Sequence, residues 1–222
     1  LVGKGFTFDA GGINLKYDSN MYQMKIDMLG SAIVYGVIDT LAKLKEKKYV
    51  IGLLPIIENM PGPDAIKPGD IITAYNGKTI EVMNTDAEGR LIMAGALAYS
   101  EKYKPSHLIN IATLSGQAGT ISNEEASIVI SNNPNLVKKI KKIGLQQYER
   151  VIELPIYKEH EELIKSDSAD VKNVNDDTNG SDCIISATFL REFVPKNTKW
   201  LHLDVCKSYL KSEEKYLPQG CT

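Results

Sequence analysis

The run Asn-Thr-Asp-Ala-Glu-Gly-Arg at 84–90 brings two carboxylates and a guanidinium together directly after a strand-like segment. Asp86 and Glu88 stand close to each other at the end of that segment, so their carboxylates can converge on one cation. Arg90 can hold an anion beside the cation without being a ligand itself. The run also fits a helix capping box that starts at Thr85, with an apolar helix behind it. Taken alone, it favours this purely structural interpretation, in which both carboxylates complement a helix dipole.

A second group of charges lies near the start of the chain, where residues 1–12 read as a short apolar strand that breaks into a glycine-lined loop. This segment carries Lys4 and Asp9 and leads to Lys16, and such loops are where α/β sheets place their chemistry. It lacks the spacing of a P-loop or of a dinucleotide-binding turn, so nucleotide binding is disfavoured. The next acid, Asp27, opens a long apolar-periodic helix, where a charge is costly unless it is paired or metal-bound.

These two regions together suit a pair of divalent cations. They supply four carboxylates, from Asp9, Asp27, Asp86 and Glu88, with lysine and arginine side chains beside them. Carboxylates that bridge two metals can neutralise both, and two metals about 3.5 to 4 Å apart can share and activate one water. The sequence therefore predicts a two-metal site.

Three ordered strings carry a resemblance to a known family. They are Val-Gly-Lys-Gly-x-Thr-Phe-Asp-x-Gly-Gly-x-x-x-Lys at 2–16, Met-Lys-x-Asp-Met at 24–28 and Asn-Thr-Asp-Ala-Glu-Gly-Arg-Leu at 84–91. The chain resembles the catalytic domain of the leucine aminopeptidase (cytosol aminopeptidase) family, and the similarity extends as far as residues 202–204. The resemblance implies an enzyme, a metallo-aminopeptidase that hydrolyses N-terminal residues such as leucine from peptides.

The resemblance implies the metal ligands residue by residue. For the tightly held metal it implies four ligands, Lys4, Asp9, Asp27 and Glu88. For a second, more exchangeable metal it implies Asp9, Asp86 and Glu88, assisted by the main-chain carbonyl of Asp86. Lys4 could bind a metal only as the neutral amine, so its pKa would have to lie far below the ordinary value. The implied cofactors are two divalent ions per chain, Zn or Mn, with bicarbonate as an optional third group.

The resemblance also implies catalytic and substrate-binding residues. Lys16 would polarise the scissile carbonyl and stabilise the developing oxyanion. Arg90 would hold a bicarbonate ion or a water that acts as the base, since a guanidinium cannot accept the proton; for Arg90 alone, a surface salt bridge is the competing interpretation. Substrate binding is expected from Met24, Thr113 and Gly116. Peptide substrates and a homo-hexamer complete the implied partners.

Composition is compatible with one enzymatic domain over residues 1–222, because 43% of the residues are hydrophobic and 24% are charged. A formal net charge of -2 gives no drive toward nucleic acid or anionic membrane. No apolar run approaches the length of a membrane span and no signal peptide opens the chain, so a cytoplasmic location is expected. Three cysteines, Cys183, Cys206 and Cys221, show no Cys-x-x-Cys spacing and indicate a reducing compartment.

Other conspicuous residues are interpreted as structural. His107, His160 and His202 are scattered, which argues against a histidine-rich zinc site or a Ser-His-Asp triad, and His202 is expected in the core. The acidic segment 175–180 mimics the start of an EF-hand loop but lacks the final Glu, so it is expected to be a polar turn. The basic run 138–142 is expected to be the solvated face of a helix.

Alternating strands and helices predict an α/β fold. Strands are expected at residues 1–5, 49–57, 71–75, 79–83, 108–114, 126–131, 151–155 and 200–205. Helices are expected at residues 21–47, 86–103, 134–150, 159–166 and 182–193. This order predicts a mostly parallel mixed sheet covered by helices on both faces, with the two-metal site at the carboxyl ends of the strands.

The chain departs from the family pattern at several positions. Ala10 and Gly95 stand where the family usually has Ser and Asp, and Ser-Gly-Gln at 115–117 replaces the common Thr-Gly-Ala, which affects groups that support the ligands. Residues 205–209 replace the usual continuation and place Lys207 near the pocket for the first substrate side chain. Because an unpaired lysine is costly to bury beside two cations, we expect Lys207 to point to solvent and leucine to be preferred.

Two other classes of function stay open. A non-catalytic relative that serves as an oligomer or scaffold component is favoured by these departures. It is also favoured by the N-terminal domain and the C-terminal end that family members carry and this chain lacks, and for the same reason we expect an unstable or lower-order oligomer. A metal-dependent phosphohydrolase is a weaker interpretation of the acidic cluster. Metal content and hydrolysis of aminoacyl amides would separate the three.

Overall fold

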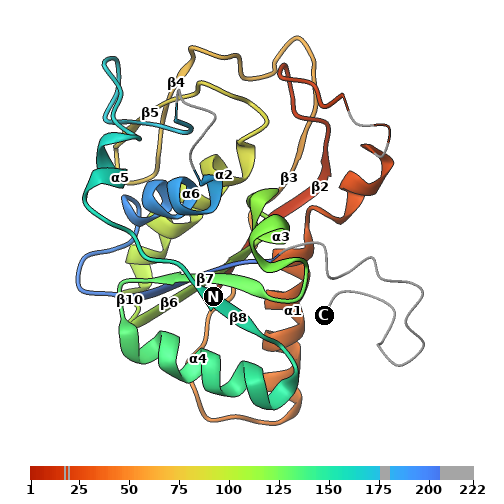
Figure 1. The fold of residues 1–222 in the computed structure, drawn as a ribbon, viewed down its shortest axis with the longest axis vertical. Helices are drawn as coiled ribbons and strands as arrows, with labels where there is room; N and C mark the ends of the chain where they lie inside the picture. Colours follow the sequence, from red (N-terminus) through yellow and green to blue (C-terminus); the bar gives the residue numbers. More distant parts are fainter. Residues whose placement is uncertain (18, 20, 176–180, 206–222) are drawn as a thin grey trace.

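The structure is a computed structural model that describes residues 1–17, 19, 21–175 and 181–205 (Figure 1). Its centre is a five-stranded sheet in the order β1-β6-β10-β7-β8. The strands are β1 (Val2–Gly3), β6 (His107–Ala112), β10 (Lys199–Asp204), β7 (Ser127–Ser131) and β8 (Val151–Glu153). β1, β6 and β10 are parallel, whereas β7 runs antiparallel to β10 and parallel to β8. The expected mostly parallel mixed sheet is confirmed.

Helices cover both faces of this sheet, as expected (Figure 1). The long helices are α1 (Leu29–Lys43), α2 (Glu88–Tyr99), α4 (Pro134–Gln147) and α6 (Asp182–Arg191). On β10, Trp200 packs into the core cluster that holds α2 and α6, whereas the next residue, Leu201, packs toward Val137 of α4. Successive side chains of a strand point to opposite faces, so the two clusters lie on the two sides of one sheet.

Two smaller sheets flank the central one. β2 (Gly5–Asp9) pairs in parallel with β3 (Ile56–Asn59). The other sheet has the order β4-β5-β9 and consists of β4 (Ile71–Thr73), β5 (Thr79–Glu81) and β9 (Val171–Lys172). The remaining short helices are η1 (Met21–Ile26), η2 (Ser100–Tyr103), α3 (Gln117–Ser122) and α5 (Glu159–Glu162). Among the described residues, no helix is both long and apolar enough to cross a membrane.

Glycines let α1 lie directly against the central sheet. A Cβ atom at Gly30 would lie 2.2 Å from the carbonyl oxygen of Ile111 in β6, and one at Gly3 would lie 2.3 Å from the carbonyl oxygen of Gly30. Only residues without a Cβ permit this approach. The contact fixes the start of α1, and with it the position of Asp27, relative to β1 and β6.

Several element boundaries differ from those expected. The segment 1–5 is not one strand: it divides at Lys4 into β1 and β2, which pair with different sheets. The helix expected at 21–47 breaks before Leu29, because the main-chain carbonyl of Asp27 accepts a hydrogen bond from the amide of Phe6 in β2. The two breaks bring the side chains of Lys4 and Asp27 together, with Lys4 Nζ 2.8 Å from Asp27 Oδ2.

Other elements are shorter than expected or were missed. The strand expected at 49–57 is limited to β3 and a single bridge at Leu53, since Pro55 cannot donate a ladder hydrogen bond. The helix expected at 159–166 shrinks to α5. Neither α3 nor β9 was predicted from the sequence. α3 follows Ser115 and Gly116, two small residues that resemble a turn more than a helix start.

Candidate metal centre

One cavity of about 490 Å³ is lined by all ten residues that were expected to bind metal, to bind substrate or to act in catalysis. Lys4, Asp9, Lys16, Met24, Asp27, Asp86, Glu88, Arg90, Thr113 and Gly116 all line it. Asp9 ends β2, Thr113 follows the last residue of β6, and Glu88 begins α2. The cavity therefore lies at the carboxyl ends of strands, where open α/β sheets place their ligands.

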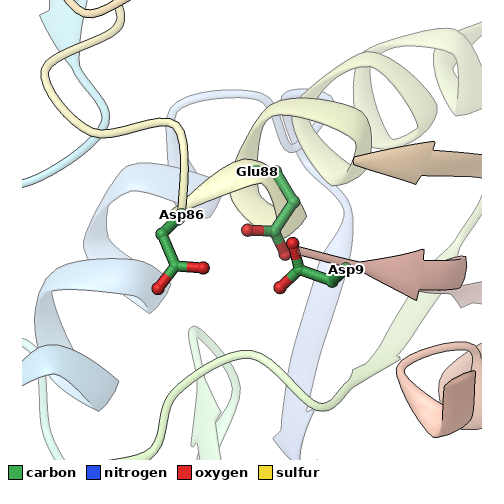
Figure 2. A group of neighbouring side chains, drawn as sticks. All are labelled: Asp9, Asp86 and Glu88. Atoms are coloured by element: carbon green, nitrogen blue, oxygen red, sulfur yellow. The ribbon is translucent and has the colours of Figure 1, made fainter. Parts of the chain in front are cut away.

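Three carboxylates form the most compact group in this cavity (Figure 2). One oxygen each from Asp9, Asp86 and Glu88 lies within 4.8 Å of the others. The Asp9 and Glu88 side chains are buried, whereas the Asp86 side chain is 33% exposed, so the group opens toward the cavity on the Asp86 side. Such a group could hold a metal ion.

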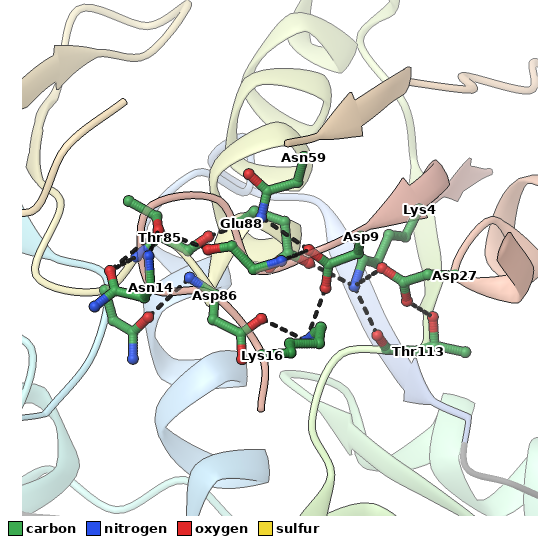
Figure 3. Close-up of polar contacts among 12 residues, drawn as sticks. Lys4, Asp9, Asn14, Lys16, Asp27, Asn59, Thr85, Asp86, Glu88 and Thr113 are labelled. Carbon is green, nitrogen blue, oxygen red and sulfur yellow. Dashed lines mark hydrogen bonds and ion pairs between the residues drawn. The ribbon is translucent and has the colours of Figure 1, made fainter. Parts of the chain in front are cut away.

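Lys4 joins two more segments to the group (Figure 3). Its Nζ lies 2.8 Å from Asp27 Oδ2 and 2.9 Å from Glu88 Oε1, and it donates a hydrogen bond of 2.9 Å to the Thr113 carbonyl. The Thr113 hydroxyl in turn donates to Asp27. Burial acts to lower the pKa of Lys4, but Asp27 and Glu88 outweigh it and raise that pKa above its ordinary value. The ion-paired Lys4 is thus an ammonium. Lys4 could become the neutral amine that binds a metal only if metal cations replaced it as the partners of Asp27 and Glu88.

Lys16 lies on the other side of the carboxylates. Its Nζ is 2.9 Å from Asp9 Oδ2 and also contacts Asp86. Burial opposes the charge, yet the contacts with Asp86 and Asp9 raise the pKa of Lys16 to about 12. Lys16 therefore stays cationic at neutral pH, as a group that polarises a carbonyl must.

The charge balance and the donors of the cavity fit divalent cations. Burial raises the pKa values of Asp27 and Asp86, and it raises the pKa of Glu88 to about 7. Glu88 Oε2 is buried and has no hydrogen-bond partner among the described residues. Among the described residues that line the cavity, the four carboxylates that were predicted as ligands face two ammonium groups. Carboxylate oxygens with one amine suit hard or borderline cations. A buried carboxylate with a free oxygen is the group that a bound cation would satisfy.

Hydrogen bonds from uncharged donors hold the loop around the carboxylates in place (Figure 3). Asp9 Oδ1 accepts from the Asn59 amide at 2.8 Å and from the main-chain amide of Gly11 at 2.9 Å. The Thr85 hydroxyl donates to the Gly11 carbonyl at 2.7 Å. The capping-box interpretation of Thr85 is wrong, because the residue before α2 is Ala87 and no side chain of the described residues caps the helix.

Arg90 is buried in the cavity wall rather than exposed on the helix surface. Its Nη1 donates to the Asn173 carbonyl at 2.6 Å, and its Nη2 pairs with Asp182. Its Nε is buried and has no hydrogen-bond partner among the residues that the structure describes. The interpretation as a surface salt bridge is therefore wrong, although the ion pair itself exists.

Sequence reasoning missed several groups that shape the cavity. Asn173 and Asp182 hold Arg90, and Asn59 holds Asp9, but no spacing in the sequence marks them as partners. The resemblance to the family also extends through Glu-Asn-Met at 58–60, and this was the available signal for Asn59. Gly95 lines a different cavity, so its departure from the family pattern does not touch this site.

The structural interpretations of His202 and of the basic run 138–142 are confirmed, whereas other predictions concern residues outside the described part of the chain. His202 is fully buried, with Nδ1 2.8 Å from the Asn110 amide, as a core histidine. The lysines at 138–142 lie on the exposed face of α4. Lys207, Cys206, Cys221 and most of the turn expected at 175–180 lie outside the described residues.

The fold and the site together define an α/β domain with a candidate metal centre of carboxylates and lysine at the ends of its strands. The sequence model of the cytosol aminopeptidase family, catalytic domain, matches residues 1–222. The chain belongs to this family.

Curated relatives agree with this assignment. A probable cytosol aminopeptidase of Geobacter sp. (strain M21) is 44% identical over 223 residues, which cover 100% of this chain and 45% of the relative. The probable cytosol aminopeptidases of Syntrophobacter fumaroxidans and Chloroherpeton thalassium are 45% and 47% identical, each over 92% of this chain and 40% of the relative. The chain thus spans less than half the length of the relatives it matches.

Proposed function

We propose that the chain forms the catalytic part of a two-metal aminopeptidase, which hydrolyses N-terminal residues such as leucine from peptides. The observation that carries this proposal is the convergence of all ten expected site residues on one cavity, with three carboxylate oxygens within 4.8 Å of one another. Relatives named probable cytosol aminopeptidases support the same activity.

The proposed metal ligands are those that the family resemblance implies, and all of them line the cavity. Lys4, Asp9, Asp27 and Glu88 would hold the tighter ion, and Asp9, Asp86 and Glu88 the more exchangeable one, with Zn or Mn as the candidates. When bound, two divalent ions supply Lewis acidity and lower the pKa of a shared water. Asp9 and Glu88 belong to both sets, and their burial excludes the bulk water that would weaken their attraction to a cation.

Lys16 and Arg90 perform the remaining chemistry in this proposal. The Lys16 ammonium, 20% exposed at the cavity, donates a hydrogen bond to the scissile carbonyl oxygen and stabilises the negative charge that develops there. Arg90, whose buried Nε has no hydrogen-bond partner among the described residues, would hold a water or bicarbonate ion that accepts the proton, since a guanidinium cannot accept it. Asp182 shares the guanidinium, so it competes with any bound anion.

Substrate selection is assigned to the apolar and main-chain groups of the cavity. The half-buried Met24 would contact an apolar first side chain, and each buried methylene contributes about 0.8 kcal/mol. Thr113 and Gly116, in the segment between β6 and α3, would bind the substrate main chain. We further propose a cytoplasmic location, in keeping with the names of the relatives, and a homo-oligomeric state, with a hexamer as the family arrangement.

Isothermal titration with Mn²⁺ or Zn²⁺ and hydrolysis of leucyl amide test the proposal. We expect two divalent ions per chain and metal-dependent turnover. Asp27→Ala should abolish the tighter site, because it removes a ligand. Arg90→Ala should leave both ions bound and slow turnover by about 10²-fold, the usual effect of losing one group of the proton-transfer machinery.

The control for these variants is Asp39→Ala, which removes an exposed carboxylate of α1 that pairs with Lys43. It should bind both ions and turn over as the unmodified chain does. A folded chain that binds neither metal would refute the enzymatic proposal. Equal metal loss in the Asp27 and Arg90 variants would refute the assigned roles.

A further inference from the structure

Asp204 is a fully buried carboxylate at the end of β10 that no part of the proposed mechanism uses. Its partner in the strand register is Ala112, the last residue of β6. Beyond Ala112 the chain leaves the sheet and forms the loop 113–116, which leads into α3. This loop supplies two cavity residues, Thr113 and Gly116.

Both oxygens of Asp204 accept hydrogen bonds from that loop. Oδ1 accepts hydrogen bonds from the main-chain amides of Leu114 at 3.0 Å and Ser115 at 3.2 Å. Oδ2 accepts a hydrogen bond of 2.5 Å from the Ser115 hydroxyl. These three donors hold successive loop residues against the end of β10, where the strand ladder no longer does.

A thiol completes this arrangement. Cys183 Sγ of α6 lies 2.8 Å from Ser115 Oγ. The Ser115 hydroxyl proton is already directed at Asp204, so the hydroxyl oxygen accepts from the thiol. Burial raises the pKa of Cys183 to about 12, which keeps the thiol protonated as a donor. α6, the loop and β10 are therefore joined through one hydrogen-bond chain.

The loop in turn holds two of the proposed metal ligands. The Thr113 carbonyl accepts from Lys4 Nζ at 2.9 Å, and the Thr113 hydroxyl donates to Asp27. A shift of the loop would therefore move the groups that orient Lys4 and Asp27. Burying the Asp204 carboxylate costs free energy, which its three hydrogen bonds offset in part. All three donors belong to the loop 113–116, so these bonds fix the conformation of that loop.

We propose that Asp204, acting through Ser115, is a positioning residue for metal binding and turnover: it fixes the loop 113–116 so that Thr113 holds Lys4 and Asp27 in place. This inference rests on the proposed function. Groups that orient metal ligands in this way typically change metal affinity or activity by about 10- to 100-fold when they are replaced.

The test compares Asp204→Asn, Ser115→Ala and Ser115→Thr with the unmodified chain. Mn²⁺ affinity is measured by isothermal titration, and exchange of the Leu114 and Ser115 amides is measured by NMR without metal. We expect Asp204→Asn and Ser115→Ala to weaken Mn²⁺ binding by about tenfold or more and to speed exchange of both amides. Ser115→Thr keeps the hydroxyl and should retain the affinity of the unmodified chain.

Ser100→Ala is the matched control, because Ser100, like Ser115, is a buried serine with a hydrogen-bonded hydroxyl. The Ser100 hydroxyl donates to the Leu97 carbonyl, and Ser100 does not line the metal cavity. It should bind Mn²⁺ normally. The proposal is overturned if Asp204→Asn and Ser115→Ala bind Mn²⁺ as the unmodified chain does, or if Ser100→Ala weakens binding equally. If Asp204→Asn does not fold, the Ser115 pair decides. Failure of the unmodified chain to bind Mn²⁺ would instead refute the proposed function itself.

Discussion

The position of the Lys4 side chain depends on the small size of its neighbour Gly89. Its aliphatic end passes directly over α2, so that a Cβ atom at Gly89 would lie 2.7 Å from Lys4 Cε and 2.9 Å from Nζ. The residue after Glu88 must therefore be small for Lys4 to reach Glu88 and Asp27. The glycine in the run at 84–90 is part of the site, although it carries no functional group.

The first prediction replaces this glycine. Gly89→Ala should displace the flexible end of Lys4 and weaken Mn²⁺ binding and leucyl-amide hydrolysis by at least about tenfold, since small misplacements of catalytic groups can cost about 10²-fold. Gly95→Ala, in the same helix, is the control: outside the helix's own backbone, no atom of the described residues lies within 4 Å of a Cβ there. It should leave binding intact and stabilise the chain by about 0.5 to 1 kcal/mol. Equal binding by both variants would contradict the role assigned to Gly89.

The second prediction concerns pH and also belongs to one residue. Burial, with a smaller contribution from Asp182, raises the pKa of Asp204 from the ordinary value of 3.8 to about 6. The folded chain therefore holds this proton more tightly than the unfolded chain does. Its free energy of unfolding should fall as the pH rises from about 4 to about 6, by about 3 kcal/mol from this group.

Asp204→Asn isolates that contribution, because the other buried carboxylates are present in both proteins. Urea denaturation of the metal-free chains at several pH values measures the difference. The stability of the variant relative to the unmodified chain should rise between about pH 4 and pH 6 and be constant above that range. A difference that does not depend on pH would show that Asp204 titrates normally.

At the scale of elements, the site depends on helices and strands that lie unusually close together. The start of α1 contacts β1 and β6 through Gly3 and Gly30, and Asp27 precedes this contact. The atoms closest to a Cβ at Gly30 belong to the main chain of Ile111 and Lys4, so they cannot move aside as the end of a side chain could. Any side chain at Gly30 would have to push α1 away from the sheet.

The third prediction tests this contact. Gly30→Ala should destabilise the chain by about 2 kcal/mol or more, as overpacking of a close contact does. Gly36→Ala lies in the same helix, where a Cβ meets nothing within 4 Å, and should stabilise it by about 0.5 to 1 kcal/mol. Urea denaturation of both variants provides the measurement. Similar stabilities for the two variants would mean that α1 can shift without cost.

The sequence predicted the elements that carry the site better than it predicted their partners. Hydrophobic β6 and β10 and the apolar period of α1 and α2 were recognisable from local pattern. The division of the first strand at Lys4 could not be recognised in this way, because the residues of a strand do not indicate which sheet it joins. The Asp204 contacts span 89 and 90 residues, so no local pattern could indicate them. The three strings predicted the ligands, whereas the groups that orient these proposed ligands could be found only from the fold.

At the scale of the whole molecule, the site is assembled from segments far apart in the chain. Lys4, Asp27, Glu88 and Thr113 meet only when the central sheet, α1 and α2 are all in place. A cation that binds this group therefore stabilises the folded chain as a whole, by about 4 kcal/mol when its concentration is a thousand times the Kd.

The molecule also exposes apolar surface beside the site-bearing core. Ile56 and Ile57 of β3 are 61% and 52% exposed, and Tyr75 nearby is 62% exposed. These residues line one open concavity with Ile92 and Tyr99. Among the described strands, β3 pairs only with β2, so its other edge is also unpaired. Contiguous apolar patches and free edges of this kind favour association.

The last prediction is that this surface mediates association between copies of the chain. Sedimentation velocity at micromolar concentration should detect oligomers of the unmodified chain. Ile57→Lys should shift the population toward monomers, because a charge on the patch opposes its burial. Ile143→Lys changes an isoleucine of α4 that is 53% exposed and should leave the distribution unchanged. Urea denaturation should give the same stability for both variants, since neither side chain is in the core. A monodisperse, thermally stable monomer would contradict the expected association, and equal dissociation by both variants would place the interface elsewhere.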